Sequence, residues 1–286
     1  MPAIRPSGPI DVYSATQVGS AILAMARSAE TIAMNAWQNP PASGFGAGLY
    51  IDRSYTAAVS QMSISVASGL DHLRALGYAL QQDDPLTTSL GTIARGAVEA
   101  LGRAWWMLSS DTSLQCRHRA ALLLAKEGQG LYSRGIMSPN SAGEDGRALF
   151  DATLHSQLAE TTEGVAATEM PTLRQFLSRT PSFTTLASEV LDATGIDGAV
   201  AYSRLSGIAH GESLHLMARG VSTTPTTAGL AQTYEWVAQV TRYPLDALHV
   251  TIELLVRRWG TASEAEEWQR IRDISFDQIG AVLDAR

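Results

Sequence analysis

The sequence has very little cysteine and little charge. Cys116 is the one cysteine among 286 residues, so no disulfide can form within the chain, and we expect a reducing compartment. Charged residues make up only 17% of the sequence, which indicates that much of the chain is buried or packed against a partner. The net charge of −7 argues against broad attraction to nucleic acid or anionic membranes, but it leaves room for a small basic site.

Long hydrophobic runs and strand patterns are also missing. No run of about 18 uncharged apolar residues occurs, so we expect no membrane-spanning segment. The Pro-rich first residues have no apolar core and are not typical of a signal peptide. We therefore expect a cytoplasmic protein without a membrane partner. Apolar and polar residues nowhere alternate over a stretch bounded by hairpin turns, which argues against a sheet.

Apolar residues at helical spacing are what the sequence does contain, and they predict an all-α bundle of roughly seven to nine helices. We expect one helical domain over residues 1–286, with possible halves 11–136 and 147–286. Asp111 is a predicted helix N-cap, and Ser263 with Glu266 forms a predicted capping box for the last helix. The other predicted helices cover residues 11–37, 51–82, 85–108, 114–132, 147–159, 197–219 and 230–259, with shorter ones between 160 and 195.

One predicted helix carries a charged stripe. Arg95, Glu99 and Arg103 stand four residues apart and therefore share one face, while the apolar residues of this segment form a separate stripe. Two interpretations are open. The stripe is either a solvated ladder of ion pairs or the wall of an internal polar site, where a buried triad would need full hydrogen bonding.

The stretch AYSRLSGIAHGESLH, residues 201–215, has the highest density of reactive groups. Tyr202, Ser206 and His210 stand at i, i+4 and i+8 on one stripe, whereas Arg204 and Glu212 belong to another. A plain alternative is that His210 packs inside the bundle and bonds to Ser206 or a carbonyl. No nucleophile elbow is present, which argues against a serine hydrolase.

Metal and thiol chemistry have weaker support. Glu212 and His215 form one Glu-x-x-His element, but a carboxylate di-iron bundle needs two such elements and two more carboxylates. We therefore predict no metal and no cofactor, and a metal-dependent oxidase stays an alternative. Cys116 lies beside three basic residues that could lower its pKa, although a lone cysteine is usually structural.

The motifs on the two helices resemble a group of bacterial helical proteins related to the HEPN superfamily. The matching pattern is Arg-x-x-x-Glu at Arg95 and Glu99, followed by Tyr-x-x-Leu-Ser-x-x-x-His from Tyr202 to His210. Arg204 and His210 also match the HEPN spacing of arginine and histidine. Leu205 departs from the polar residue that usually follows the arginine.

The resemblance implies metal-independent ribonuclease activity of a defence or toxin–antitoxin type. Arg204 and His210 would be the catalytic pair, at the interface of a symmetric homodimer. A guanidinium would hold the phosphate, and an imidazole, which titrates near neutral pH, would transfer protons. The supporting binding residues would be Arg95, Glu99, Arg103, Tyr202, Ser206 and Glu212. The alternative is a non-catalytic helical module that binds a partner protein or a small anionic ligand.

Overall fold

The protein is built from helices and turns. The computed structural model describes residues 10–39, 41, 43–49, 55–82, 87–134, 144–162, 170–210 and 234–283, and these ranges contain no strand. The prediction of an all-α fold is confirmed, and the described residues form more helices than the seven to nine expected. The helices are α1 (Val12–Gln38), α2 (Gly44–Leu49), α3 (Tyr55–Leu80), α4 (Thr87–Leu108), α5 (Ser113–Ser133), α6 (Glu144–Glu160), α7 (Leu173–Arg179), α8 (Phe183–Asp192), α9 (Gly198–Ala209), α11 (Tyr234–Trp259) and α12 (Ala262–Leu283).

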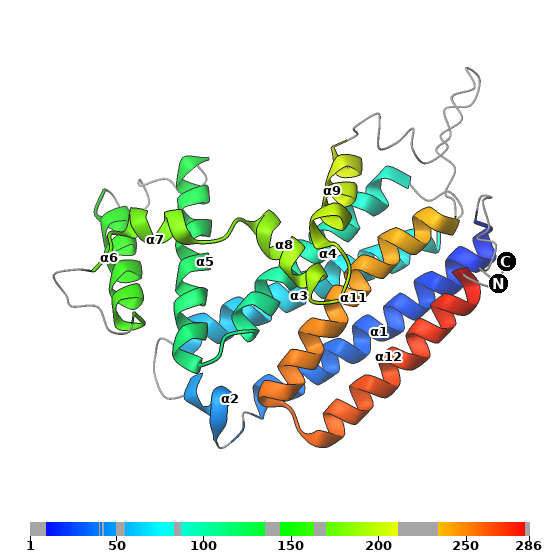
Figure 1. Ribbon diagram of the computed structural model, residues 1–286, viewed down its shortest axis with the longest axis horizontal. Coiled ribbons are helices and arrows are strands. Elements are labelled where there is room, and N and C mark those ends of the chain that lie inside the picture. The colour runs from blue at the N-terminus through cyan, green and yellow to red at the C-terminus, as the bar shows by residue number, and fades with distance from the viewer. Residues whose placement is uncertain are drawn as a thin grey trace.

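Helix α4 lies at the centre of the bundle. It packs against α3, α8, α9 and α11, which lie around it in Figure 1. Because these helices cover it on several sides, α4 needs a wide apolar face. Its fully buried side chains are Leu90, Ala94, Ala97, Val98, Leu101, Ala104, Met107 and Leu108. The face that remains carries the charged stripe predicted from the sequence.

The first and last described helices lie side by side. Figure 1 shows α1, α11 and α12 as three long helices along one side of the molecule, and α1 packs against both of the others. The Tyr234 hydroxyl of α11 donates a hydrogen bond of 2.7 Å to the carboxylate of Asp11, which also caps α1. One buried apolar cluster includes residues from α1 through α12, so both predicted halves contribute to the same core.

Helices α5, α6 and α7 form a lobe beside this bundle (Figure 1). A second, smaller apolar cluster holds the lobe together, and it consists of Ala121, Leu122, Leu158 and Phe176. Lys126 of α5 ties the lobe to the segment before α8, because its ammonium donates to the carbonyls of Thr180 and Pro181.

Several predicted helix ends are wrong by a few residues. Thr112, and not Asp111, caps α5, because its hydroxyl accepts a hydrogen bond from the Gln115 N–H. Thr261 and Glu264 form the capping box of α12, two residues before the predicted Ser263 and Glu266. In both places Ser, Thr or Asp occurs at neighbouring positions, and composition alone does not distinguish them.

Two further differences concern helix length. The structure ends α9 at Ala209, with His210 as its C-cap, and the remainder of the predicted helix, to residue 219, lies outside the described residues. The short helix α2 begins within the Pro- and Gly-rich stretch at 39–48, where no helix was predicted. Within the described ranges, no helix combines the length and the apolar character needed to cross a membrane.

Candidate functional site

Helix α9 brings the Tyr202 stripe onto the charged face of α4. Asp197 caps α9 by accepting a hydrogen bond from the Val200 N–H, which sets the start of the helix. Gly91 of α4 allows close contact with α9, because a Cβ there would lie 2.8 Å from a methyl group of Ile208. Tyr202 is buried in this contact, with 4% of its surface exposed, and His210 lies exposed at the C-cap of α9.

Four of the predicted site residues form one hydrogen-bonded network. The Tyr202 hydroxyl donates to Glu99 Oε1 at 2.5 Å, and Arg95 Nε donates to the same oxygen at 2.7 Å. Arg95 Nε also lies 3.2 Å from the Tyr202 hydroxyl, and Arg95 Nη1 lies 2.9 Å from His210 Nε2. The two sequence motifs, more than 100 residues apart, therefore meet at one place.

The donors and acceptors determine where the protons are. A guanidinium only donates hydrogen bonds, so His210 Nε2 must accept, and a neutral His210 carries its proton on Nδ1. Burial and the hydrogen bond to Glu99 raise the pKa of Tyr202, which keeps the phenol protonated. Burial alone would lower the pKa of Arg95, but hydrogen bonding to Glu99 and its charge raise it overall.

Arg95 keeps several donors for another group. A guanidinium has five N–H donors, and in the described part of the chain only the Nε donor and one Nη1 donor are engaged. The side chains of Arg95 and Glu99 are 25% and 28% exposed, so a ligand can reach this face of α4.

The other predicted site residues lie apart from this network. Arg103 pairs with Glu127 of α5 at 2.7 Å and lies over the ring of Phe183. Ser206 is half-buried, and its carbonyl accepts the His210 backbone N–H at 3.0 Å. Arg204 is exposed on α9, and among the described residues no hydrogen bond or ion pair joins it to His210. Glu212 lies outside the described residues, as does His215.

Thiol chemistry at Cys116 is not supported. Its side chain is fully buried against Met62, and burial raises its pKa to about 12 in spite of the neighbouring arginines. The suggestion that these arginines could lower its pKa was wrong because desolvation of the thiolate outweighs their attraction. The described ranges contain no group of three or more His, Cys, Asp or Glu residues that could hold a metal ion.

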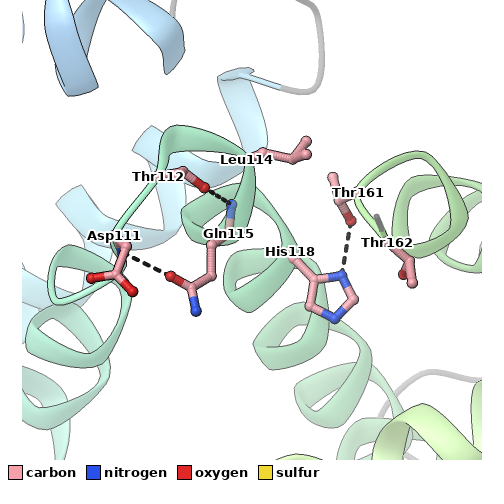
Figure 2. A pocket seen from close by; sticks show the side chains of 7 residues that line it. All are labelled: Asp111, Thr112, Leu114, Gln115, His118, Thr161 and Thr162. Carbon is pink, nitrogen blue, oxygen red and sulfur yellow. Dashed lines mark hydrogen bonds between the residues drawn. The ribbon is translucent and has the colours of Figure 1, made fainter. Parts of the chain in front are cut away.

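A second polar region, not predicted from the sequence, is a pocket of about 380 Å³ between the start of α5 and the end of α6 (Figure 2). His118 Nδ1 lies 3.0 Å from the Thr161 hydroxyl, which donates its own proton to the Gln157 carbonyl at 2.8 Å. His118 Nδ1 must therefore be the donor, and its Nε2 carries a lone pair. Burial lowers the pKa of His118, which favours this neutral form. The lining residues are Asp111, Thr112, Leu114, Gln115, His118, Thr161 and Thr162.

His72 of α3 is a further imidazole next to the network. A Cβ at Gly96 would lie 2.7 Å from the His72 ring. The ring therefore packs against the backbone of α4 at Gly96, a residue that lies between Arg95 and Glu99 in the sequence. The sequence feature that could have indicated this contact is Gly96, a glycine within the charged face of a helix.

The fold and the network define an all-α protein with an Arg–Glu–Tyr–His cluster between two helices. Comparison with protein-family models, with curated proteins and with solved structures found no match. The resemblance to HEPN proteins stays a prediction.

Proposed function

We propose that this protein binds the phosphodiester backbone of RNA at Arg95 and His210 and cleaves it without a metal ion. The observation that carries the proposal is the 2.9 Å contact between a guanidinium with unused donors and an exposed imidazole. A phosphate that accepts from Arg95 would replace His210 Nε2 as the acceptor. His210 could then take up a proton, because the anion would separate two positive charges.

The surrounding residues support this role by holding Arg95. Glu99 and Tyr202 fix the Nε edge of the guanidinium, so its Nη groups keep a defined direction. Such preorganised donors stabilise the negative charge that develops on the non-bridging phosphate oxygens during cleavage. Here Arg95, and not Arg204, is the guanidinium next to His210.

The homodimer and Arg204 belong to the same proposal. Val200 and Arg204 are four residues apart on α9, and both are exposed, Val200 at 46%. This face of α9 is where a second copy would pack, with Arg204 of each copy beside the RNA backbone. We expect the protein to act as a cytoplasmic homodimer, with its mass in solution as the test.

A cleavage assay tests the proposed activity. The wild-type protein, incubated with single-stranded RNA in excess chelator, is expected to give fragments ending in 2′,3′-cyclic phosphate and to leave DNA intact. His210→Ala and Arg95→Ala are expected to lower the rate by about 10²-fold or more. His118→Ala is the matched control, since it also removes an imidazole that makes a side-chain hydrogen bond, and it should cleave at the wild-type rate.

A non-catalytic binding module is the second candidate. It is favoured by the hydrogen bonds from Tyr202 and Arg95 to Glu99. These bonds hold α9 against α4, which is a structural role that needs no catalysis. Wild-type protein that binds a phosphodiester through Arg95 but leaves RNA intact would decide for this candidate.

A further inference from the structure

The charged face of α4 has an imidazole on each side. His210 reaches it from α9, where it contacts Arg95. His72 reaches it from α3, where its ring lies against Gly96 at a distance that leaves no room for a side chain. The two histidines come from helices that pack on different sides of α4.

Helix geometry places the charged groups between these two rings. With a turn of about 100° per residue, Glu99 lies about 40° and Gly96 about 100° around α4 from Arg95. Arg103 lies about 80° around from Arg95 by the same rule. The order around the helix is therefore Arg95 with His210, then Glu99 and Arg103, then Gly96 with His72.

We propose that His72 is the general base and His210 the general acid of the RNA cleavage proposed above, with the phosphodiester lying across this face of α4. The inference rests on the proposed function and adds a second catalytic residue to it. His72 Nε2 would take the proton of the 2′-hydroxyl, and O2′ would form a bond to phosphorus. The bond from phosphorus to O5′ would break, and His210 would give its proton to O5′.

The surroundings of His72 suit a base. Burial lowers the pKa of His72, and the charge of Arg103 acts in the same direction, while Asp71 and Glu99 oppose it. The lowered pKa leaves the ring neutral and able to accept a proton near pH 7. Arg103 also has a buried Nε donor without a hydrogen-bond partner among the described residues, so this face has an unused donor.

The test measures cleavage as a function of pH for wild type, His72→Asn and the control His155→Asn. His155 is also half-buried, but its Nε2 lies 3.0 Å from the Pro171 carbonyl in the lobe. We expect His72→Asn to lower the rate at pH 7 by about 10²-fold or more and to remove the loss of rate on the acidic side. His155→Asn should keep both the rate and the profile.

A second pair of variants keeps the test usable if His72→Asn does not fold. Gly96→Ala removes no titratable group, but its methyl group displaces the His72 ring, so cleavage should fall at least tenfold. Gly130→Ala is its control, because a Cβ there would meet only Arg134, at 3.5 Å.

The outcomes separate the two proposals. If His72→Asn or Gly96→Ala cleaves RNA at the wild-type rate with the wild-type pH profile, His72 is not the base, while loss of activity in His210→Ala would keep the proposed function. If the wild-type protein leaves RNA intact, both proposals are overturned.

Discussion

His210 on α9 and His118 on α5 each make a side-chain hydrogen bond to another helix, but they use opposite nitrogens. His210 uses Nε2, which accepts from Arg95, whereas His118 uses Nδ1, which donates to Thr161. Both rings therefore carry their proton on Nδ1 when neutral, and they differ in what the Nε2 lone pair meets. At His210 it meets a cation, and at His118 it is unused by the described residues.

This difference shows that the hydrogen-bond partner of a histidine ring determines which kind of ligand the ring can bind. An anion that accepts the hydrogen bond of Arg95 would take the place of His210 Nε2 as acceptor. The ring would then be free to bind a proton, which the negative charge of the anion favours. The pocket of His118 has Asp111 as its one charged lining residue, so nothing there draws a phosphate. The proposal therefore places an anion at the α4–α9 network, and the α5–α6 pocket serves as an internal reference for it.

The largest expected effect is a difference in stability between two variants. Each variant loses a side chain that accepts a hydrogen bond, one in the α4–α9 network and one at the α5–α6 pocket. Glu99→Ala leaves the partly buried donors of Arg95 and Tyr202 without their shared partner, and we expect a loss of about 2 kcal/mol in the free energy of unfolding. Gln115→Ala removes an exposed contact at the start of α5 and should cost less than about 0.5 kcal/mol. Urea denaturation of both variants checks this, and equal losses would contradict the distinction.

A smaller effect is expected from removing a single hydroxyl. Tyr202→Phe keeps the buried ring but loses the hydrogen bond to Glu99, which we expect to cost about 1 kcal/mol. The same variant should weaken phosphodiester binding, because Arg95 is then held by Glu99 alone. Thr161→Val is the matched change at His118 and should leave that binding unaltered, as measured by calorimetric titration. Equal binding by wild type and Tyr202→Phe would show that the hydroxyl does not position Arg95.

The smallest effect concerns acid. Burial lowers the pKa of His72, His118 and His249 from the ordinary value of 6.5. The unfolded chain therefore binds more protons just below pH 6.5, so stability is complete above that pH and falls as the pH decreases through this window. His118→Gln should flatten the dependence of the melting temperature on pH between 7.5 and 5.5; an unchanged slope would contradict the assignment.

Much of the fold followed from the sequence because helical periodicity is a local signal. The long helices α1, α3, α4 and α5 were predicted to within a few residues, apart from ends outside the described ranges. Cap positions were less certain, since Thr112 competes with Asp111 and Thr261 with Ser263 for the same role. The short helix α2 was missed because its glycines give no periodic pattern.

The site was predicted only in part, for a physical reason. Periodicity showed that Arg95 and Glu99 share a face and that Tyr202 and His210 share another, but it could not show that the two faces meet. That contact depends on how α9 packs against α4, which is a tertiary property. The position of His72 beside Gly96 was not predicted, because it depends on the absence of a side chain at Gly96.

The most direct test of the central claim measures the protons taken up when a phosphodiester binds. The ligand is a 2′-deoxydinucleotide, which carries one phosphodiester and cannot be cleaved. Calorimetric titrations at pH 7.5, in buffers with different ionisation enthalpies, report the proton uptake for wild type and for His210→Gln. We predict net uptake by the wild type and none by His210→Gln. Absence of binding, or equal uptake by both proteins, would contradict an anion site at Arg95 and His210.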